Sequence, residues 1–183
     1  SGKKNIMGQD VEKIKAAYDS LAGEWTEKFL NEHADKPMDR EVLKKFSVLV
    51  GERTPVWDFG CGPGATSRCL SDLGTRIAGL DCSEKMLEQA RSHHPDIPFQ
   101  KGDILNLDFE EGSVAAVVSF YAIIHFTEEQ VRRAFDETYR VLQPGGLFLC
   151  TFHLGSDTIH LDEFLGKEID IDRRNAFIGR IYG

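Results

Sequence analysis

Apolar residues recur at steps of three and four along the first fifty positions, which is the period of a helix with one buried face. Residues 11–30 show this spacing, and residues 38–50 repeat it. The pattern predicts two amphipathic N-terminal helices. The apolar positions of the first are Val11, Ile14, Tyr18, Leu21, Ala22, Trp25 and Phe29.

Beyond residue 50, short apolar runs alternate with amphipathic segments. Strands are expected near Val56, Ile77, Phe99 and Val117. Helices are expected over residues 66–73, 83–91 and 128–142. Thr127 and Gln130 have the spacing of a capping box at the start of the last helix. Such alternation predicts an α/β fold with a doubly wound, mostly parallel sheet and helices on both faces.

The segment PVWDFGCGPGA, residues 55–65, has an apolar run that ends in an acid and then in three closely spaced glycines, Gly60, Gly62 and Gly64. Glycine has no Cβ, so the backbone can turn sharply and approach a ligand closely. The helix that follows directs its unpaired N–H groups at the same place. Asp58 is positioned to accept hydrogen bonds from a cationic amino group. The segment therefore predicts a cofactor-binding turn.

The glycines alone leave the cofactor open. Gly60, Gly62 and Ala65 also fit the dinucleotide fingerprint G-x-G-x-x-G/A, with Asp81 near the expected ribose position. A further acid, Asp103, closes the next strand-like run, and a nicotinamide enzyme has no routine need for it. Carboxyl ends of parallel strands meet at one sheet edge, and four candidate residues lie at such ends: Asp58, Asp81, Asp103 and Phe120.

The sequence Asp58-Phe59-Gly60-Cys61-Gly62-Pro63-Gly64 resembles motif I of the class I S-adenosylmethionine-dependent methyltransferases. The Pro144-Gly145-Gly146 break before the fifth strand is also similar to that family. The resemblance implies a Rossmann-like fold, S-adenosyl-L-methionine as cofactor and S-adenosyl-L-homocysteine as product. The contacts that it implies involve Tyr18, Asp58, Gly60, Cys61, Gly62, Gly64, Asp81, Cys82, Met86, Asp103, Ile104 and Phe120.

Within that implied site, Asp81 binds the ribose hydroxyls, and Asp103 meets the adenine amino group beside the backbone N–H of Ile104. Cys82 and Met86 flank the adenine. Two other functions stay open, an NAD-dependent oxidoreductase and a non-catalytic cofactor-binding module. Asp103 and the Pro144-Gly145-Gly146 element argue against the oxidoreductase.

The segment AYDSLAGEWTEKF, residues 17–29, resembles the lid of many small-molecule methyltransferases. The whole chain, 1–183, is then one domain, with a helical lid over residues 1–50 and a core over residues 51–183. Tyr18 either touches the methionine end of the cofactor or packs on the core-facing stripe of its helix. For Trp25 the core position is favoured.

Methyl transfer from a sulfonium is an in-line displacement, which depends mainly on alignment of donor and acceptor. An acceptor that carries a proton needs a base, and His125 follows the fourth strand in FYAIIHF. The same imidazole could contact the cofactor or pack beneath the lid. The expected reaction is transfer of a methyl group to a small-molecule acceptor.

Composition narrows the class of partner. The chain has 183 residues, of which 41% are hydrophobic, enough for one domain with a core. Its net charge of −8 argues against a surface built for nucleic acid. We also expect no membrane partner and a cytoplasmic location, because no apolar run approaches the ~20 residues of a membrane span and the N-terminus has no signal core. The cysteines have no metal-ligand or disulfide spacing, so free thiols and no metal site are expected: Cys61, Cys69, Cys82 and Cys150.

The C-terminal tail departs from the family pattern. The family normally supplies a helix and two antiparallel strands after the fifth strand, yet GKEIDI is followed almost at once by RRNAFIGRIYG. Residues 175–182 are expected to form the final, antiparallel strand, and GKEIDI to lead into the missing helix. Either the protein has a shortened sheet, or the sequence lacks on the order of 30 residues near 171–173. The second alternative is favoured, and it predicts a break between Ile169 and Arg174.

Overall fold

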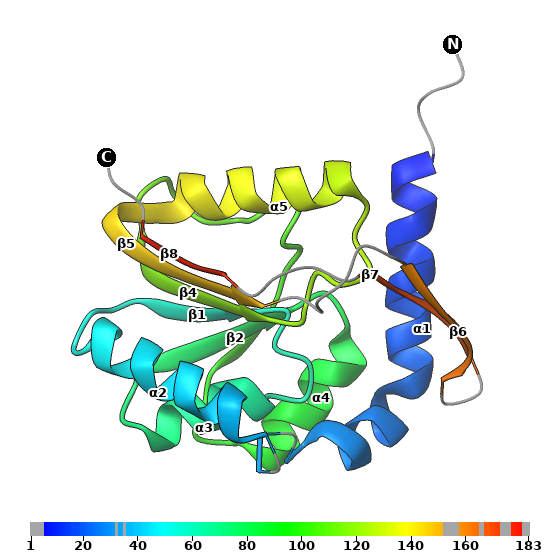
Figure 1. Cartoon of the computed structure of the whole chain (residues 1–183), viewed down its shortest axis with the longest axis horizontal. Helices are drawn as coiled ribbons and strands as arrows, with labels where there is room; N and C mark the ends of the chain where they lie inside the picture. Colours follow the sequence, from blue (N-terminus) through cyan, green and yellow to red (C-terminus); the bar gives the residue numbers. More distant parts are fainter. Residues whose placement is uncertain are drawn as a thin grey trace.

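The computed structural model describes residues 6–31, 33–34, 36–151, 158–164, 167–172 and 177–180. After two N-terminal helices, strands and helices alternate over residues 56–101 and again over residues 114–151, as the apolar pattern predicts (Figure 1). The helices are α1 (Ile6–Phe29), α2 (Pro37–Val50), α3 (Ala65–Asp72), α4 (Glu84–His93) and α5 (Glu128–Val141). The strands are β1 (Val56–Phe59), β2 (Ile77–Asp81), β3 (Phe99–Lys101), β4 (Val114–Phe120), β5 (Leu142–Thr151), β6 (Thr158–Phe164), β7 (Lys167–Asp172) and β8 (Phe177–Arg180).

The main sheet has the strand order β3-β2-β1-β4-β5-β8. Strands β3, β2, β1, β4 and β5 pair in parallel, and β8 pairs with β5 in the antiparallel sense. The chain order reverses between β1 and β4. In open α/β sheets this switch point opens the crevice in which ligands bind.

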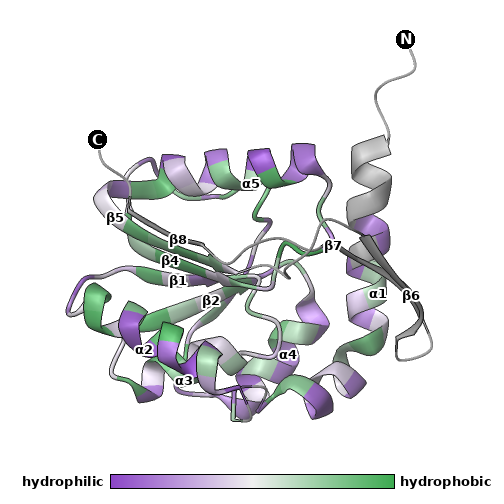
Figure 2. Ribbon diagram, in the orientation of Figure 1, coloured by the Kyte–Doolittle hydropathy of each residue, from purple (hydrophilic) through white to green (hydrophobic). Residues whose placement is uncertain are grey.

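Helices cover both faces of the sheet, which confirms the doubly wound α/β fold. α2 and α3 pack on one face and α5 on the other (Figure 1). Strand β4 is buried along its whole length and serves both layers, with Val117 in the core beneath α5 and Ala116 and Val118 in the core beneath α2. Figure 2 shows the hydrophobic residues gathered on the central strands, while hydrophilic residues mark the outer side of α5.

Two helix starts follow from local capping. Ser83 caps α4 by accepting a hydrogen bond from the Met86 N–H at 3.1 Å. Thr127 and Gln130 form the predicted capping box of α5, with the Gln130 N–H donating to Thr127 Oγ1 and the Thr127 N–H to Gln130 Oε1. These caps fix where the loops before both helices end, and both loops border the candidate site.

The helix before the fifth strand ends at Val141, but β5 begins at Leu142, so the Pro144-Gly145-Gly146 element lies within the strand and not before it as expected. The Pro144-Gly145-Gly146 segment lies in an irregular stretch early in β5, and Gly145 has a φ of +73°. A Cβ at Gly146 would lie 2.8 Å from the Gln143 carbonyl oxygen, so close backbone approach requires glycine there.

The tail corrects one expectation. GKEIDI does not lead into a helix, because Lys167–Asp172 forms β7, which pairs with β6 as an antiparallel two-stranded sheet. The alternation of polar and apolar residues in TIHLDEF and KEIDID has the period of a strand. β8 falls within the predicted range 175–182. The expected break lies partly at residues 173–174, outside the described residues, so the omitted segment stays a prediction.

Candidate cofactor site

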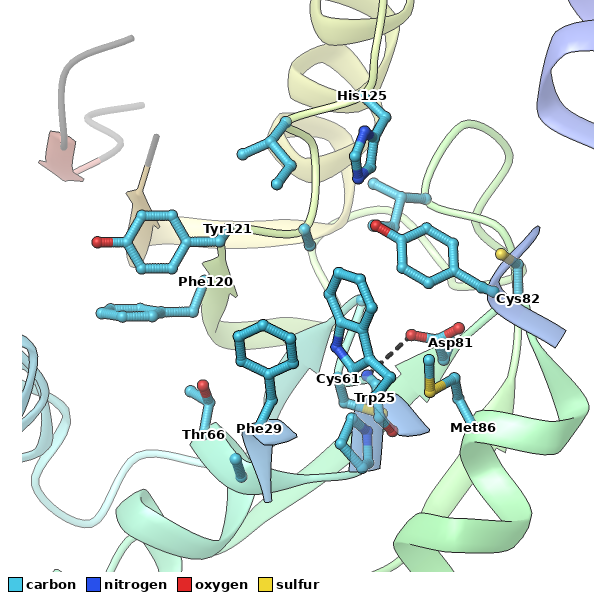
Figure 3. Close-up of a pocket in the computed structure, with 18 of the residues that line it drawn as sticks. Trp25, Phe29, Cys61, Thr66, Asp81, Cys82, Met86, Phe120, Tyr121 and His125 are labelled. Carbon is cyan, nitrogen blue, oxygen red and sulfur yellow. Dashed lines mark hydrogen bonds between the residues drawn. The ribbon is translucent and has the colours of Figure 1, made fainter. Parts of the chain in front are cut away.

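A cavity of about 310 Å³ lies beyond the carboxyl ends of the central strands, between them and α1 (Figure 3). Its wall comes from α1, the turn after β1, the ends of β2 and β4, and the loops after β3 and β4. The predicted site residues that line it are Tyr18, Gly60, Cys61, Gly62, Asp81, Cys82, Met86, Asp103, Ile104, Phe120 and His125. The structure therefore brings together most of the residues singled out from the sequence.

The glycine turn forms the floor of this cavity. The backbone N–H groups of Gly60 and Cys61 both donate to the Leu80 carbonyl, at 2.7 and 3.0 Å, which ties the turn to β2. Gly60 has a φ of +75°, and a Cβ on it would lie 2.3 Å from the Cβ of Ala122. Only glycine fits this position, both in conformation and in space. Gly62, the next glycine of the turn, lines the cavity and has nothing within 4 Å of the place that a Cβ would take, so the backbone there is open to a ligand.

Asp81 ends β2 at the edge of the cavity. Its Oδ2 accepts a hydrogen bond from the Gly62 N–H and its Oδ1 one from the Ser83 N–H, both at 2.9 Å. Burial raises the pKa of this carboxyl, and the N–H donors oppose the rise. A carboxylate has about four acceptor positions, so both oxygens retain capacity for a diol. The carboxylate is therefore fixed in direction where the ribose is expected.

The adenine end of the predicted site lies around Cys82, Met86 and Asp103. The Asp103 Oδ1 accepts from the Leu105 N–H at 2.8 Å, which orients the carboxylate beside Ile104. Burial raises the pKa of the Cys82 thiol to about 12, with the charge of Asp81 contributing. The thiol is then neutral and acts as an apolar wall rather than a nucleophile. The four cysteines are free thiols, as expected.

Asp58 and Gly64 do not line the cavity. Asp58 is buried, and its Oδ2 accepts a hydrogen bond from Ser67 Oγ at 2.6 Å. Gly64 is the N-cap of α3 with a φ of +88°, and a Cβ there would lie 2.9 Å from the rings of His94 and Phe99. The geometry thus gives both residues structural roles beneath the turn, and a direct cofactor contact by either one stays a prediction.

The aromatic residues of α1 are closer to the site than the sequence indicated. The Tyr18 ring packs edge-on against Trp25 and His125, with centroid distances of 5.3 and 5.6 Å. Burial, reinforced by Asp81 and Cys82, raises the pKa of the Tyr18 phenol well above its usual range, so the phenol stays protonated. Trp25 also lines the cavity and is half-buried, so its predicted place in the core is wrong.

Sequence reasoning missed the loop between α1 and α2. His33 is 5% exposed, and its Nε2 lies 2.9 Å from Thr66 Oγ1 in the first turn of α3. Lys36, in the same loop, lines the cavity. Tyr121 was missed as well. In the structure its backbone has a φ of +54°, and its N–H donates to Thr151 Oγ1 at 2.9 Å. Neither helical period nor motif spacing marks such loop residues.

A test of the His33 contact uses pH. Burial, with a smaller effect of Lys36, lowers the pKa of His33 to about 4, whereas an unfolded histidine has a pKa of about 6.5. Below about pH 6.5, His33 therefore binds more protons in the unfolded state than in the folded state. The contribution of the neutral, buried His33 to stability is complete above that pH and falls as the pH drops toward 4. The wild-type protein is expected to lose about 2 kcal/mol more free energy of unfolding between pH 7.5 and 5 than His33→Gln, measured by urea denaturation. Equal losses in the two proteins would contradict the burial of a neutral His33 in the folded state.

The described part of the chain has neither a metal-binding cluster nor a membrane-spanning helix. No group of three or more His, Cys, Asp or Glu residues there could hold a metal ion. No helix in the same residues has the length and apolar character to cross a membrane.

An α/β sheet with a glycine turn at its switch point and acids after successive strands defines the nucleotide-cofactor-binding class of fold. Comparison with known proteins gives the family. The methyltransferase domain family model matches residues 56–146, about half of the chain. The chain belongs to the class I S-adenosylmethionine-dependent methyltransferase family, whose cofactor is S-adenosylmethionine.

Similar proteins with assigned names are also methyltransferases. Demethylmenaquinone methyltransferase from Paenarthrobacter aurescens is 34% identical, over 58% of this chain and 41% of the relative. Malonyl-[acyl-carrier protein] O-methyltransferase from Pectobacterium atrosepticum is 36% identical, over 50% of this chain and 36% of the relative. A solved S-adenosylmethionine-dependent methyltransferase from Mesorhizobium loti is 28% identical with a TM-score of 0.53, covering 71% of this chain and 62% of that one. The chain spans between 46% and 59% of three further methyltransferases. No support for the oxidoreductase alternative emerges from these relatives.

Proposed function

We propose that this chain transfers a methyl group from S-adenosylmethionine to a small-molecule acceptor and releases S-adenosylhomocysteine. The observation that carries the proposal is the cavity itself, which is lined by the glycine turn, Asp81 and Asp103. The residues fit the cofactor, because nothing lies within 4 Å of the place that a Cβ would take at Gly62, which lines the cavity, and because Asp81 presents a fixed carboxylate.

When bound, S-adenosylmethionine supplies an electrophilic methyl group on a sulfonium. The chain's own residues hold, orient and enclose the reactants. Asp81 is proposed to bind the ribose, Asp103 and the Ile104 N–H the adenine, and Tyr18 to cover the methionine end. Alignment of this kind supplies much of the rate acceleration of a displacement between two bound molecules.

His125 is the proposed general base for an acceptor that loses a proton. It lines the cavity and is half-buried, and its ring packs against Tyr18, which limits its orientation. It follows β4 on the loop that also carries Tyr121 and Ala122, so it lies on the side of the cavity opposite α4 (Figure 3). An imidazole in this position can accept a proton as the methyl group is transferred.

The proposal is tested by turnover with methyl-labelled S-adenosylmethionine against a library of small molecules with hydroxyl, carboxyl and amino groups. Appearance of label in an acceptor, with stoichiometric S-adenosylhomocysteine, supports a methyltransferase. Tight binding of S-adenosylhomocysteine with no labelled product from any acceptor would favour the non-catalytic cofactor-binding module.

Once an acceptor is found, His125→Ala is expected to lower kcat at least ~100-fold with less than a twofold change in the Kd of S-adenosylhomocysteine, because a base acts on the acceptor alone. The wild-type rate is expected to fall at acid pH, where a protonated imidazole cannot accept a proton. His93→Ala, which changes an exposed histidine in the last turn of α4, is the matched control. A loss of cofactor affinity or of stability with unchanged kcat would instead assign His125 to packing.

A further inference from the structure

We propose that the methyl acceptor is a flat, apolar molecule that carries an anionic group, with aromatic side chains enclosing its body and Lys36 binding its charge. The inference rests on the proposed function, since it assigns the part of the cavity that the cofactor leaves to the acceptor.

The cavity has two chemically different ends. Cys82, Met86 and Asp81 mark the end assigned to adenosine. Phe120 and Tyr121 lie at the opposite side, and Trp25 and Phe29 lie between the two ends (Figure 3). A molecule that accepts the methyl group must approach from beyond the sulfonium, so it occupies the aromatic end.

The rings form two pairs, each contributed by one part of the chain. Trp25 and Phe29, both on α1, have a centroid distance of 4.7 Å, and Phe120 and Tyr121, at the end of β4, one of 5.1 Å. Rings contributed from two sides of a cavity favour a flat, apolar occupant that can stack or pack against their faces.

The backbone of Tyr121 supports a role in binding. Its φ of +54° is in the left-handed region, which residues other than glycine rarely adopt. The conformation is held by the hydrogen bond from its N–H to Thr151 Oγ1, and Thr151 is itself buried on β5. Strained backbone of this kind clusters at ligand sites, where it directs a side chain that an ordinary conformation would point elsewhere.

Lys36 provides the charge. It is the only lysine or arginine among the described residues that line the cavity. Its ammonium lies 5.5 Å from the centroid of the Tyr121 ring and 4.0 Å from Asp39 Oδ2. An ammonium carries three N–H donors and can bind more than one partner at a time. Among the described residues, the acids that line the cavity, Asp81 and Asp103, are assigned to the adenosine end, so the position beside Lys36 is the one that favours an anion.

The carboxylate of the cofactor is the competing occupant of this position. A zwitterionic amino acid needs polar partners for its ammonium as well as its carboxylate. Of the two neighbours of Lys36 described above, the Tyr121 ring lines the cavity, whereas the Asp39 carboxylate does not. The chemistry of this end therefore fits an apolar anion better than a second zwitterion.

The test uses 2-naphthoate and 2-naphthamide, which share a flat ring system and differ in charge. Calorimetry measures each probe with protein saturated with S-adenosylhomocysteine. Wild type is expected to bind the naphthoate at least ~10-fold more tightly than the amide. Lys36→Met should remove that preference, and Lys44→Met, on the exposed side of α2, should keep it. Tyr121→Leu should weaken both probes.

The outcomes distinguish a failure of the proposed function from a failure of the acceptor assignment. No binding of S-adenosylhomocysteine by wild type contradicts the proposed function. With that ligand bound, equal affinity for both probes, or none for the naphthoate, overturns only the acceptor assignment. The assignment is also overturned if Lys36→Met weakens S-adenosylhomocysteine at least ~10-fold but leaves 5′-methylthioadenosine unchanged. That nucleoside lacks the carboxylate, so the result would assign Lys36 to the cofactor.

Discussion

Asp81→Ala is expected to weaken S-adenosylmethionine binding at least ~10-fold. Both oxygens of this carboxylate are oriented by the backbone N–H groups of Gly62 and Ser83, at the place where the ribose hydroxyls are expected. Hydrogen bonds to a charged acceptor contribute roughly 1.5–3 kcal/mol, and a tenfold change in Kd corresponds to about 1.4 kcal/mol. Calorimetric titration with S-adenosylhomocysteine and with adenine measures the change.

Adenine is the internal control for this variant. Its affinity should change little, because the adenine contacts are assigned to Asp103, Ile104, Cys82 and Met86. Asp81→Asn keeps one oxygen that can accept from the backbone and should retain more of the fold of the turn. An S-adenosylhomocysteine Kd that is the same in wild type and Asp81→Ala would remove Asp81 from the site.

Gly60→Ala is expected to abolish measurable cofactor binding and to lower the free energy of unfolding by about 1–3 kcal/mol. The added Cβ would lie 2.3 Å from the Cβ of Ala122, at a φ of +75° that alanine rarely adopts. The turn must then move, and with it the backbone on which the cofactor rests. Calorimetry and urea denaturation measure the two effects.

Two further variants separate steric overlap from loss of glycine itself. Gly62→Ala, where a Cβ would meet nothing within 4 Å although φ is +51°, should cost less stability than Gly60→Ala. Ala122→Gly combined with Gly60→Ala removes the closest clashing atom and should restore part of both properties. If the double variant is no better than Gly60→Ala alone, the overlap with Ala122 is not the reason for the glycine.

The features of this protein that the sequence predicted are those set by local chemistry. Thr127 caps its helix through a neighbour three residues away, and Gly60 is required by the turn in which it lies. Asp81 and Asp103 could be assigned to one site because each follows a strand, and the ends of parallel strands share an edge. Such residues are accessible to pattern analysis because the decisive contacts are close in sequence or fixed by topology.

The residues that were missed or misplaced depend on contacts across the chain. His33 meets Thr66 across 33 positions, and the Tyr121 hydroxyl approaches Asp39 Oδ1 at 3.5 Å across 82 positions. Asp58 has the motif position of a cofactor ligand, yet it accepts a hydrogen bond from Ser67 on the next helix. In the tail, the family pattern predicts a helix, but the two-residue alternation of KEIDID forms the strand β7.

Titration of the wild-type protein with S-adenosylhomocysteine and, separately, with NAD tests the central claim most directly, because it needs no acceptor. The cavity is expected to bind one S-adenosylhomocysteine per chain, with no heat of binding from NAD at the same concentrations. Binding of NAD in preference to S-adenosylhomocysteine, or binding of neither, would contradict the assignment of this site to S-adenosylmethionine.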